Sequence, residues 1–459
     1  MGDAPLTRAE RLALADKATF DPQYGTPLKR SIIAPSDEEA IKACWADIIS
    51  TLADAHKEIT TKGPSIIPEV DFADLYKLTD AQKDEIRQVG SVVVHNVVDD
   101  EKALEWKAML REYVKANPQV EGFPEGNMQF FQMYWAKSQV QARADPNVIG
   151  VQKALNALWT TPRDPNLLIS FSTPVAYADR FRIRTDPVWK AHPPHIDGAK
   201  IERWADDSLR SCFASVLKGQ WKEHDPFVVD GRIPAETNIH KKPGQASIFR
   251  SWQGWLAMSN TGPGEGTLKV FPNVQLSNAY VVLRPFFRLR SPDLDPMQVE
   301  NWEYDPDTAH YPGLQPQKSM RLNEDTHPHL RLTDTMTCMP RVLPGDMVFW
   351  HCDVIHSVEE EHNGPSDSSV MYIPACPMTL RNASYLARQR ETFKTGATPP
   401  DYGMNIKPET GFALIATEED IVSVEGKRAM GFAAFPIDES APKGEKDLLR
   451  EANRLLGFA

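Results

Sequence analysis

HPPHIDG, at residues 192–198, sets a histidine and an aspartate two positions apart, at His195 and Asp197. Successive side chains of a β-strand point to opposite faces, so both residues would leave the same face and could hold one metal ion. The spacing alone is not specific, because the chain contains other His-x-acid pairs. One of them, His56 with Glu58, lies in a predicted helix, where residues two apart point away from each other. We therefore keep the pair in HPPHIDG as a candidate metal site and discard the helical pair.

A third pair of this kind stands in LPGDMVFWHCDVIHSV, residues 343–358, where His351 and Asp353 precede a further histidine, His356. If this segment forms one continuous strand, His356 shares a face with Trp350. His351 and Asp353 then point to the opposite face. With His356 as a metal ligand, these two side chains would orient neighbouring loops or the ligands themselves. A β-bulge within the segment would overturn this expectation.

The sequence around these motifs is typical of antiparallel β-structure. From about Leu168 onward, short runs rich in β-branched and aromatic residues alternate with Pro, Gly and Asp. The runs are LISF, VAYADRFRI, SIFRSWQGWLAMSN, GTLKVFPNV, MVFW, VIHSV and SSVMYIP. Many short strands separated by turn residues favour a β-sandwich or a barrel over a parallel α/β sheet.

Helices are predicted on both sides of this β-rich region. Apolar residues at helical spacing and a capping box formed by Ser36 and Glu39 predict a helix over residues 36–58. A second capping box, Thr79 with Gln82, opens a short helix, and SVVVHNVV after it is a predicted buried strand. Further predicted helices cover residues 101–115, two segments between 128 and 159, residues 379–393 and residues 444–456.

The composition is that of a globular protein: of 459 residues, 41% are hydrophobic and 25% are charged. A formal net charge of -12 makes the surface repel phosphates and anionic lipids, so neither nucleic acid nor a membrane is an expected partner. Nowhere do about 18 uncharged apolar residues follow one another, and the N-terminus lacks the apolar run of a signal peptide. We therefore expect a soluble cytoplasmic protein. The five cysteines form no CxxC motif, which argues against a disulfide framework or a zinc knuckle.

Three landmarks follow one another in the order HPPHID, WLAMSNTGPGEGTLKVFPNV and LPGDMVFWHCDVIHSV. This order resembles the double-stranded β-helix of 2-oxoglutarate-dependent oxygenases, in particular their phytanoyl-hydroxylase-like branch. Members of that branch carry an HxD at the end of a core strand, a Gly-x-Leu strand ending in Pro, a Pro-Gly-Asp turn and a distal ligand histidine. Within the branch the sequence is most similar to the YbiU-like family, from about Gly90 to Arg390.

The resemblance implies an α+β fold with a double-stranded β-helix of the jelly-roll, cupin-like type, flanked by N-terminal and C-terminal helices. Together with the predicted helices it divides the chain into a mainly helical lead-in over 1–115, an oxygenase core over 116–395 and a C-terminal extension with a terminal helix over 396–459. The core carries two insertions, 199–245 and 285–335. These insertions could fold over the open end of the β-scaffold as a substrate lid.

Carried over residue by residue, the resemblance makes His195, Asp197 and His356 the metal ligands and the catalytic centre. Two histidines and one carboxylate on one face of an octahedron leave three positions for O2 and a chelating cosubstrate, which suits Fe(II). The implied cofactors are therefore Fe(II), 2-oxoglutarate and O2. The implied reaction oxidises a small-molecule substrate, by hydroxylation in the default case, and releases succinate and CO2. Two other histidines, His192 and His224, are expected in turns or at the surface.

The expected cosubstrate site departs from the pattern of the relatives. They place an Arg or Lys on the strand after the distal histidine, where it pairs with the far carboxylate of 2-oxoglutarate, but SDSSVMYIP at 366–374 contains no cation. A buried carboxylate needs a partner, and the fork of an arginine suits it best. The first candidate is Arg381 and the second is Arg184, with Ser369 and Tyr372 as hydrogen-bond donors. The alternatives are Arg182, Arg250 and Arg341.

Two other classes of protein stay open at this point. The missing cation favours a cupin-like isomerase or hydrolase that uses the same metal triad without 2-oxoglutarate. The third hypothesis is a non-catalytic binding protein that keeps only the fold, and failure to bind Fe(II) or Mn(II) would favour it. Substrate choice depends on loop conformations, so the sequence indicates only a small molecule. It does not determine the oligomeric state.

Overall fold

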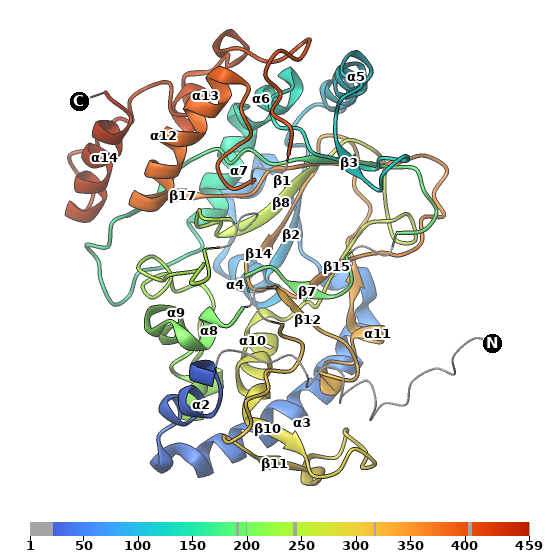
Figure 1. Cartoon of the computed structure of the whole chain (residues 1–459), viewed down its shortest axis with the longest axis vertical. Helices are drawn as coiled ribbons and strands as arrows, with labels where there is room; N and C mark the ends of the chain where they lie inside the picture. The colour runs from blue at the N-terminus through green and yellow to red at the C-terminus, as the bar shows by residue number, and fades with distance from the viewer. Residues whose placement is uncertain are drawn as a thin grey trace.

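This computed structural model of the chain describes residues 22–189, 192–198, 200–241, 246–315, 318–402 and 406–458. Helices and several β-sheets are both present, so the predicted α+β class is confirmed. In Figure 1 the sheets lie between two helical parts of the molecule. The upper left part contains α12 (Leu380–Thr395), α13 (Val424–Ala429) and α14 (Lys443–Leu455), and the lower part contains α2 (Thr26–Ile32), α3 (Glu38–Lys62) and α10 (Val274–Leu283).

Two sheets form the centre of the molecule. The larger sheet has eight strands in the order β1 (Glu69–Asp71), β2 (Ser91–His95), β14 (Met347–His351), β8 (Trp252–Ala257), β16 (Ser368–Tyr372), β6 (Phe181–Arg184), β4 (Phe130–Phe131) and β3 (Gly122–Phe123). The smaller sheet has five strands in the order β12 (Met320–Arg321), β7 (His195–Ile196), β15 (His356–Val358), β9 (Leu268–Val270) and β13 (Thr337–Cys338). Strands β8 and β14 are buried along their whole length, which explains their nearly continuous apolar sequence.

Eight of these strands alternate between the two sheets along the chain. From β6 to β9 the strands belong in turn to the larger, smaller, larger and smaller sheet. From β13 to β16 they belong in turn to the smaller, larger, smaller and larger sheet. Because of this alternation, segments that are far apart in the sequence become neighbours in each sheet.

The Pro-Gly-Asp turn before β14 ties this strand to the end of β2. Gly345 has a φ of 90°, and a Cβ on it would lie 2.0 Å from the carbonyl oxygen of Val98, so the close approach requires glycine. The carboxylate of Asp346 accepts hydrogen bonds from the backbone N–H groups of Leu343 and Asn96, at 2.8 and 2.9 Å. The Pro-Gly-Asp turn therefore stabilises the contact between β14 and the chain that follows β2 in the larger sheet.

Most predicted helices form where the apolar spacing indicates them. These are α3, α4 (Asp80–Val89), α5 (Asp100–Ala116), α6 (Lys137–Arg143), α7 (Pro146–Asn156), α12 and α14. The capping box that Thr79 opens is present. The capping box predicted at Ser36 is wrong, because Pro35–Asp37 form a 3-10 turn and the side chain of the N-cap residue, Asp37, makes no capping hydrogen bond.

Both predicted insertions contain regular structure. The first, over 199–245, contributes α8 (Glu202–Ala205) and α9 (Asp207–Ser211). The second, over 285–335, contributes β10 (Phe287–Leu289), β11 (Trp302–Tyr304), β12 and α11 (Leu332–Thr335). Strand β12 pairs with β7, so the second insertion extends the smaller sheet next to HPPHIDG. A separate two-stranded sheet joins β5 (Ile169–Pro174) to β17 (Pro377–Thr379).

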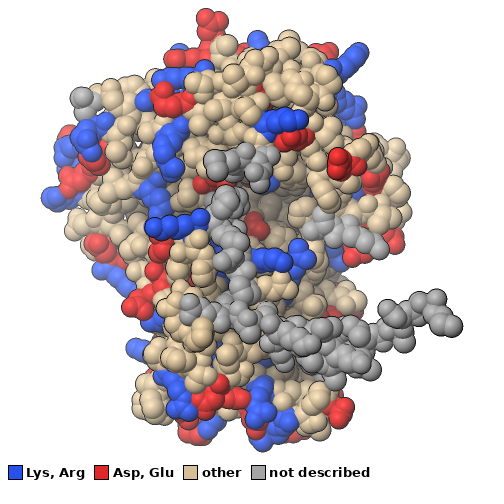
Figure 2. All heavy atoms as spheres, in the orientation of Figure 1, with Lys and Arg blue, Asp and Glu red and all other residues tan. Residues whose placement is uncertain are grey.

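The surface is charged and mixed in sign. Lys and Arg side chains alternate with Asp and Glu side chains over the face drawn in Figure 2. Among the described helices, none combines the length and the apolar character that crossing a membrane requires.

Candidate functional site

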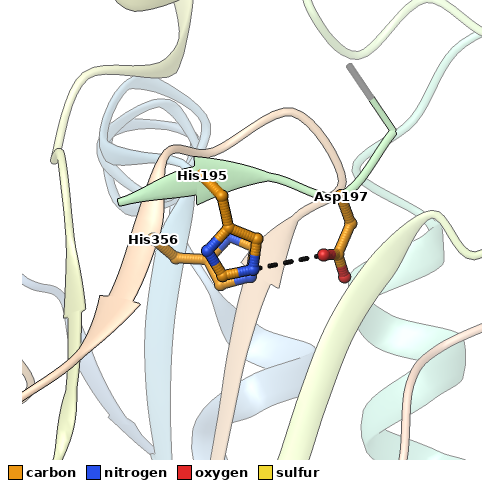
Figure 3. A group of neighbouring side chains, drawn as sticks. All are labelled: His195, Asp197 and His356. Atoms are coloured by element: carbon orange, nitrogen blue, oxygen red, sulfur yellow. Dashed lines mark ion pairs between the residues drawn. The ribbon is translucent and has the colours of Figure 1, made fainter. Parts of the chain in front are cut away.

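The three residues singled out in the sequence meet at one end of the smaller sheet (Figure 3). His195 lies on β7, Asp197 follows in the turn directly after this strand, and His356 begins β15. Strands β7 and β15 are antiparallel, and His195 and His356 are directly opposite each other. Their rings therefore lie side by side, with centroids 4.2 Å apart. The ligand atoms of all three side chains lie within 4.8 Å of one another.

Backbone carbonyls determine which nitrogen of each histidine faces this group. A carbonyl can only accept a hydrogen bond, so Nδ1 of His195 donates to Pro193 at 2.7 Å and Nδ1 of His356 donates to Val354 at 3.0 Å. Each neutral ring then keeps a lone pair on Nε2. On His195 this nitrogen lies 3.2 Å from Oδ1 of Asp197. Metal-binding histidines are commonly oriented by a hydrogen bond of this kind on their second nitrogen.

The three groups strongly influence one another's pKa. Burial raises the pKa of Asp197, but the hydrogen bond with His195 outweighs this effect, and the pKa lies well below its ordinary value. Burial lowers the pKa of His356 to about 3, and the charge of His195 acts in the same direction. For His195, burial lowers the pKa, but the contact with Asp197 raises it by a larger amount, so the pKa lies above its ordinary value. At neutral pH the site offers a carboxylate anion and a neutral imidazole nitrogen, which suits a divalent cation.

A second group with potential ligand atoms, His351, Cys352 and Asp353, lies at the turn after β14. Both ring nitrogens of His351 are engaged within the protein: Nδ1 accepts from the N–H of Asp353 at 3.0 Å, and Nε2 donates to the carbonyl of Pro226 at 3.1 Å. The carboxylate of Asp353 pairs with two buried arginines of the segment 200–241. This group therefore orients neighbouring segments, as predicted, and its donors are not available to a metal.

The assumption behind that prediction, one continuous strand through this motif, is wrong. Strand β14 ends at His351 in the larger sheet, and β15 begins at His356 in the smaller sheet. The chain turns at Cys352 because it passes from one sheet to the other. Trp350 and His356 nevertheless line the same cavity, and their ring centroids are 5.3 Å apart.

The triad lies in the wall of a cavity of about 460 Å³ between the two central sheets. Aromatic side chains such as Trp255 and Trp350 cover part of this wall. Three arginines, Arg180, Arg182 and Arg250, also line it. A cavity that combines aromatic walls with converging polar groups is a candidate small-molecule site.

Arg184 does not lie where its predicted role requires it. Its side chain is buried outside the cavity lining and donates hydrogen bonds to four backbone carbonyls in the segments 186–187 and 359–360. Gly266 makes room for this guanidinium, since a Cβ there would lie 2.9 Å from Nη1 of Arg184. Arg184 therefore joins β6 to the chain after β15, and its position does not support a cosubstrate contact.

Three more predicted or alternative residues lie outside this cavity. Arg381 lies in the first turn of α12, donates to a backbone carbonyl at 2.6 Å and lines a second, neighbouring cavity. The hydroxyl of Ser369 donates to Asp367 at 2.5 Å. Arg341 is half-exposed and pairs with Glu265 at 2.9 Å. These positions do not support contacts of the three side chains with a molecule in the first cavity.

Arg182, Arg250 and Tyr372 do line the first cavity. Arg182 on β6 lies opposite Val370 on β16 in the antiparallel pair. Its Nη2 donates to the hydroxyl of Ser368 at 3.3 Å, and its Nε has no acceptor among the described residues. A cation thus stands beside β16 although the sequence of that strand contains none.

Arg180 and His192 also line the cavity, although the sequence interpretation assigned neither a role. The alternation in DRFRIR, residues 179–184, places three arginines on one face of a strand, a signal that could have identified Arg180. His192 and His224 were expected in turns or at the surface, and both lie in connecting segments outside helices and strands. His192 is half-buried: burial lowers its pKa to about 4, and its Nδ1 accepts from the indole of Trp189 at 2.8 Å. His224 is buried rather than at the surface.

Known proteins share this architecture. The sequence profile of the Gig2-like family matches residues 21–432. The uncharacterized protein YbiU of Escherichia coli K12 is 30% identical over 400 residues, which are 84% of this chain and 90% of YbiU, so the predicted similarity to the YbiU-like family is confirmed. The crystal structure of GlcNAc Inducible Gene 2, GIG2 (DUF1479), from Candida albicans has 31% identity and a TM-score of 0.86, with 95% of each chain covered. The crystal structure of the hypothetical protein JW0805 from Escherichia coli has 29% identity and a TM-score of 0.76, with 90% of this chain and 99% of that chain covered.

Proposed function

The chain belongs to the Gig2-like family, and from its site we propose that it is an oxygenase that uses Fe(II), 2-oxoglutarate and O2 to oxidise a small molecule. One observation carries the proposal. Two imidazole nitrogens and a carboxylate meet within 4.8 Å in a cavity wall, and a backbone carbonyl orients each imidazole. In this proposal His195, Asp197 and His356 hold the metal.

The donor set fits Fe(II). Two histidines and one carboxylate can occupy one face of an octahedron and leave the opposite face open to the cavity. The hydrogen bonds on both Nδ1 atoms keep the Nε2 lone pairs directed at a shared point. When bound, iron together with 2-oxoglutarate would supply the capacity to oxidise a C–H bond with O2, with release of succinate and CO2.

The topology supports the same proposal. We assign the two central sheets to a double-stranded β-helix, because eight strands alternate between them in chain order and enclose a cavity. In such a scaffold the end of β7 and the start of β15 are adjacent, which brings the HxD motif to the distal histidine. The residues that line the first cavity all fall within 116–395, the predicted oxygenase core.

The far carboxylate of 2-oxoglutarate is assigned to Arg182, with the hydroxyls of Ser368 and Tyr372 close by. Arg182 is 3% exposed and has a free Nε–H among the described residues, so a carboxylate in the cavity would gain a charge-assisted hydrogen bond. The absence of a cation from β16 is the feature that favours an isomerase or hydrolase. Arg182 removes that argument, because it lies opposite Val370 on the neighbouring strand.

The surrounding side chains have defined tasks in this proposal. Trp255 and Trp350 cover the cavity and limit the access of water to the reacting groups. Arg250 lies 3.8 Å from Oδ2 of Asp197 and helps to keep this carboxylate ionised. The chain thus positions and shields the reaction, while the metal and the cosubstrate provide the oxidising power.

The decisive measurement is an anaerobic titration of the Fe(II)-loaded protein with 2-oxoglutarate. A weak visible charge-transfer band is expected for the wild type, since bidentate chelation to a triad iron produces one. The band is expected to disappear in His356→Ala. It should persist in His56→Ala, a matched control on α3 whose imidazole pairs with Asp334. In turnover assays His195→Ala and Asp197→Ala should be inactive with little loss of folding.

Other outcomes would contradict the proposal in distinct ways. Fe(II) binding without the band would favour the cupin-like isomerase or hydrolase. Failure to bind Fe(II) or Mn(II) would favour a binding protein that keeps only the fold. Full activity of both His195→Ala and Asp197→Ala would remove the triad from the mechanism.

A further inference from the structure

A second cavity, of about 280 Å³, adjoins the first at the triad. Arg180, Asp197, Arg250 and Gln253 line both cavities. A molecule in the second cavity would therefore lie beside the proposed metal ligand Asp197. The other walls of this cavity come from the insertion over 199–245, from α12 and from the chain after α12.

The second cavity is strongly cationic. Its cationic lining residues are Arg180, Lys200, Arg203, Arg232, Arg250 and Arg381. Its carboxylates are those of Asp197, Asp353 and Asp401. Burial raises the pKa of Asp401, so this carboxylate is ionised less readily than an exposed one. The cavity thus carries an excess of positive charge in a protein whose formal net charge is -12.

Two of these arginines are buried and only partly satisfied. Arg203 and Arg232 share the carboxylate of Asp353, at 2.8 and 2.5 Å. Arg203 is 2% exposed, yet its Nε and Nη1 have no acceptor among the described residues. The Nε of Arg232 is also without one. Buried N–H groups without an acceptor are costly and rare, so these groups indicate an acceptor that the described residues do not provide.

Two further cations form no ion pair with a carboxylate of the described residues. Lys200 is 8% exposed, and its ammonium group makes no hydrogen bond or ion pair with these residues, although the charges of Glu202 and Asp197 act on it. Arg381 donates one hydrogen bond, to the carbonyl of Ala235, and forms no ion pair within the described part of the chain. Long side chains with their charges in an enclosed wall are expensive to desolvate unless an anion compensates them.

We propose that the second cavity binds an oxyanion group of the substrate, a phosphate monoester or a carboxylate, through Lys200, Arg203 and Arg381. The inference rests on the proposed function, since it gives the chemical class of the substrate that the triad would oxidise. The guanidinium forks match two oxygens of such a group, and the lysine adds a compact charge. The anion would anchor the substrate while the remainder extends past Arg250 towards Asp197.

This anion site is separate from the one assigned to 2-oxoglutarate. Arg182 lines the first cavity, whereas Lys200, Arg203 and Arg381 line the second. Both ligands could therefore bind at the same time, one in each cavity, with the triad where the two cavities meet. Simultaneous binding is the property that distinguishes a substrate subsite from a second mode of binding for the cosubstrate.

The test measures anion binding to the metal-free full-length protein by calorimetry, with inorganic phosphate in one series and malonate in the other. The probe that binds more tightly identifies the class. We expect Lys200→Met and Arg381→Gln each to weaken that binding about tenfold, because each loses a charge-assisted contact. Arg388→Gln is the matched control: Arg388 lies on the same helix as Arg381 but is exposed, so its binding should equal that of the wild type. Unfolding curves of the three variants check that the fold is retained.

The same titration in the presence of Mn(II) and saturating 2-oxoglutarate separates the two proposals. An unchanged dissociation constant for the probe supports an independent substrate subsite. Displacement of the probe by 2-oxoglutarate would overturn it and assign the second cavity to the cosubstrate. If neither probe binds, or if all variants bind equally, the anion site is also refuted. The oxygenase proposal then still stands as long as the charge-transfer band is observed. Variant-sensitive binding without that band would leave the anion site standing and refute the oxygenase.

Discussion

At the residue scale, Arg182 provides the sharpest test of the proposed cosubstrate site, because its charge would pair with the far carboxylate of 2-oxoglutarate. Arg182 comes from β6, and β16 brings Ser368 against its Nη2. The arginine is buried, so an ionic contact there is little screened by solvent. In the proposed cosubstrate site, its position on a neighbouring strand would supply the cation that SDSSVMYIP lacks.

Arg182→Gln should weaken the binding of 2-oxoglutarate by roughly 10- to 100-fold, the usual cost of a hydrogen bond to a charged group. Arg182→Lys should recover part of the loss, because it keeps the charge but not the fork. The measurement is a titration of the Mn(II)-loaded protein with 2-oxoglutarate. Arg341→Gln serves as the control, since Arg341 is half-exposed and pairs with Glu265. Equal affinities of Arg182→Gln and the control would exclude Arg182 from the cosubstrate site.

At the scale of the element, the first residues of α3 and α4 show how two similar capping motifs can differ. Thr79 adopts an extended backbone and its hydroxyl accepts from the N–H of Gln82. Ser36 lies inside the 3-10 turn Pro35–Asp37, and within the described part of the chain its hydroxyl hydrogen-bonds to the carboxylate of Asp37, at 3.3 Å, and not to a backbone N–H of the helix. A hydroxyl caps a helix only when its own backbone is extended, so the turn removes Ser36 from this role.

Thr79→Ala should therefore lower the free energy of unfolding by about 1 kcal/mol, the typical cost of losing a helix cap. Ser36→Ala should change it by less than about 0.5 kcal/mol, as expected for an exposed position without such a contact. Urea unfolding followed by circular dichroism measures both values. Both hydroxyls are exposed, so neither variant creates a cavity. A cost for Ser36→Ala as large as that for Thr79→Ala would show that the predicted first box forms after all.

At the scale of the whole molecule, Glu409 joins parts of the chain that are distant in sequence. Its carboxylate accepts hydrogen bonds from the hydroxyl of Tyr113 on α5, at 2.7 Å, and from the N–H groups of Tyr134 and Trp135, at 2.7 and 3.2 Å. Glu409 itself lies in the C-terminal extension and is 2% exposed. Burial raises its pKa from 4.5 to about 7, although these hydrogen bonds act in the opposite direction.

This shift predicts how stability depends on pH. A carboxyl whose pKa is raised in the folded state binds its proton more tightly there than in the unfolded chain. The free energy of unfolding should therefore fall as pH rises from about 4.5 to about 7, by at most about 3 kcal/mol. Glu409→Gln keeps the shape without the titration, so the difference between wild-type and variant urea curves should vary only within this window. A constant difference across the window would contradict the raised pKa.

The division of the chain into a lead-in, a core and an extension stays a prediction. The structure does place β2, from within the predicted lead-in, next to β14 in the larger sheet. It also brings Asp401 from the predicted extension into the wall of the second cavity. Stability and substrate binding are therefore expected to depend on all three parts.

The sequence by itself determined the local features. Periodicity and turn chemistry predict these features because each depends on residues that are close in sequence. They are the strand HI with the acid after it, the Pro-Gly-Asp turn, the buried strand after Gly90 and the helices with clear apolar spacing. The family resemblance that rests on the order of the three landmarks implied that His195, Asp197 and His356 would lie together, and they do. The separation of His351 and Asp353 from them was predicted from side-chain alternation along one continuous strand, but the chain is divided between β14 and β15, so the tertiary structure decides their position.

Only the tertiary structure decided which charged groups lie around the triad. Arg182 and Arg184 lie two positions apart on the same strand, yet Arg182 lines the cavity and Arg184 is bound by backbone carbonyls. Lys200 and Arg381 are brought together from segments that no local pattern relates. The physical reason is that the cost of burying a charge is compensated by groups distant in the chain, and the tertiary packing of strands, helices and loops selects those groups.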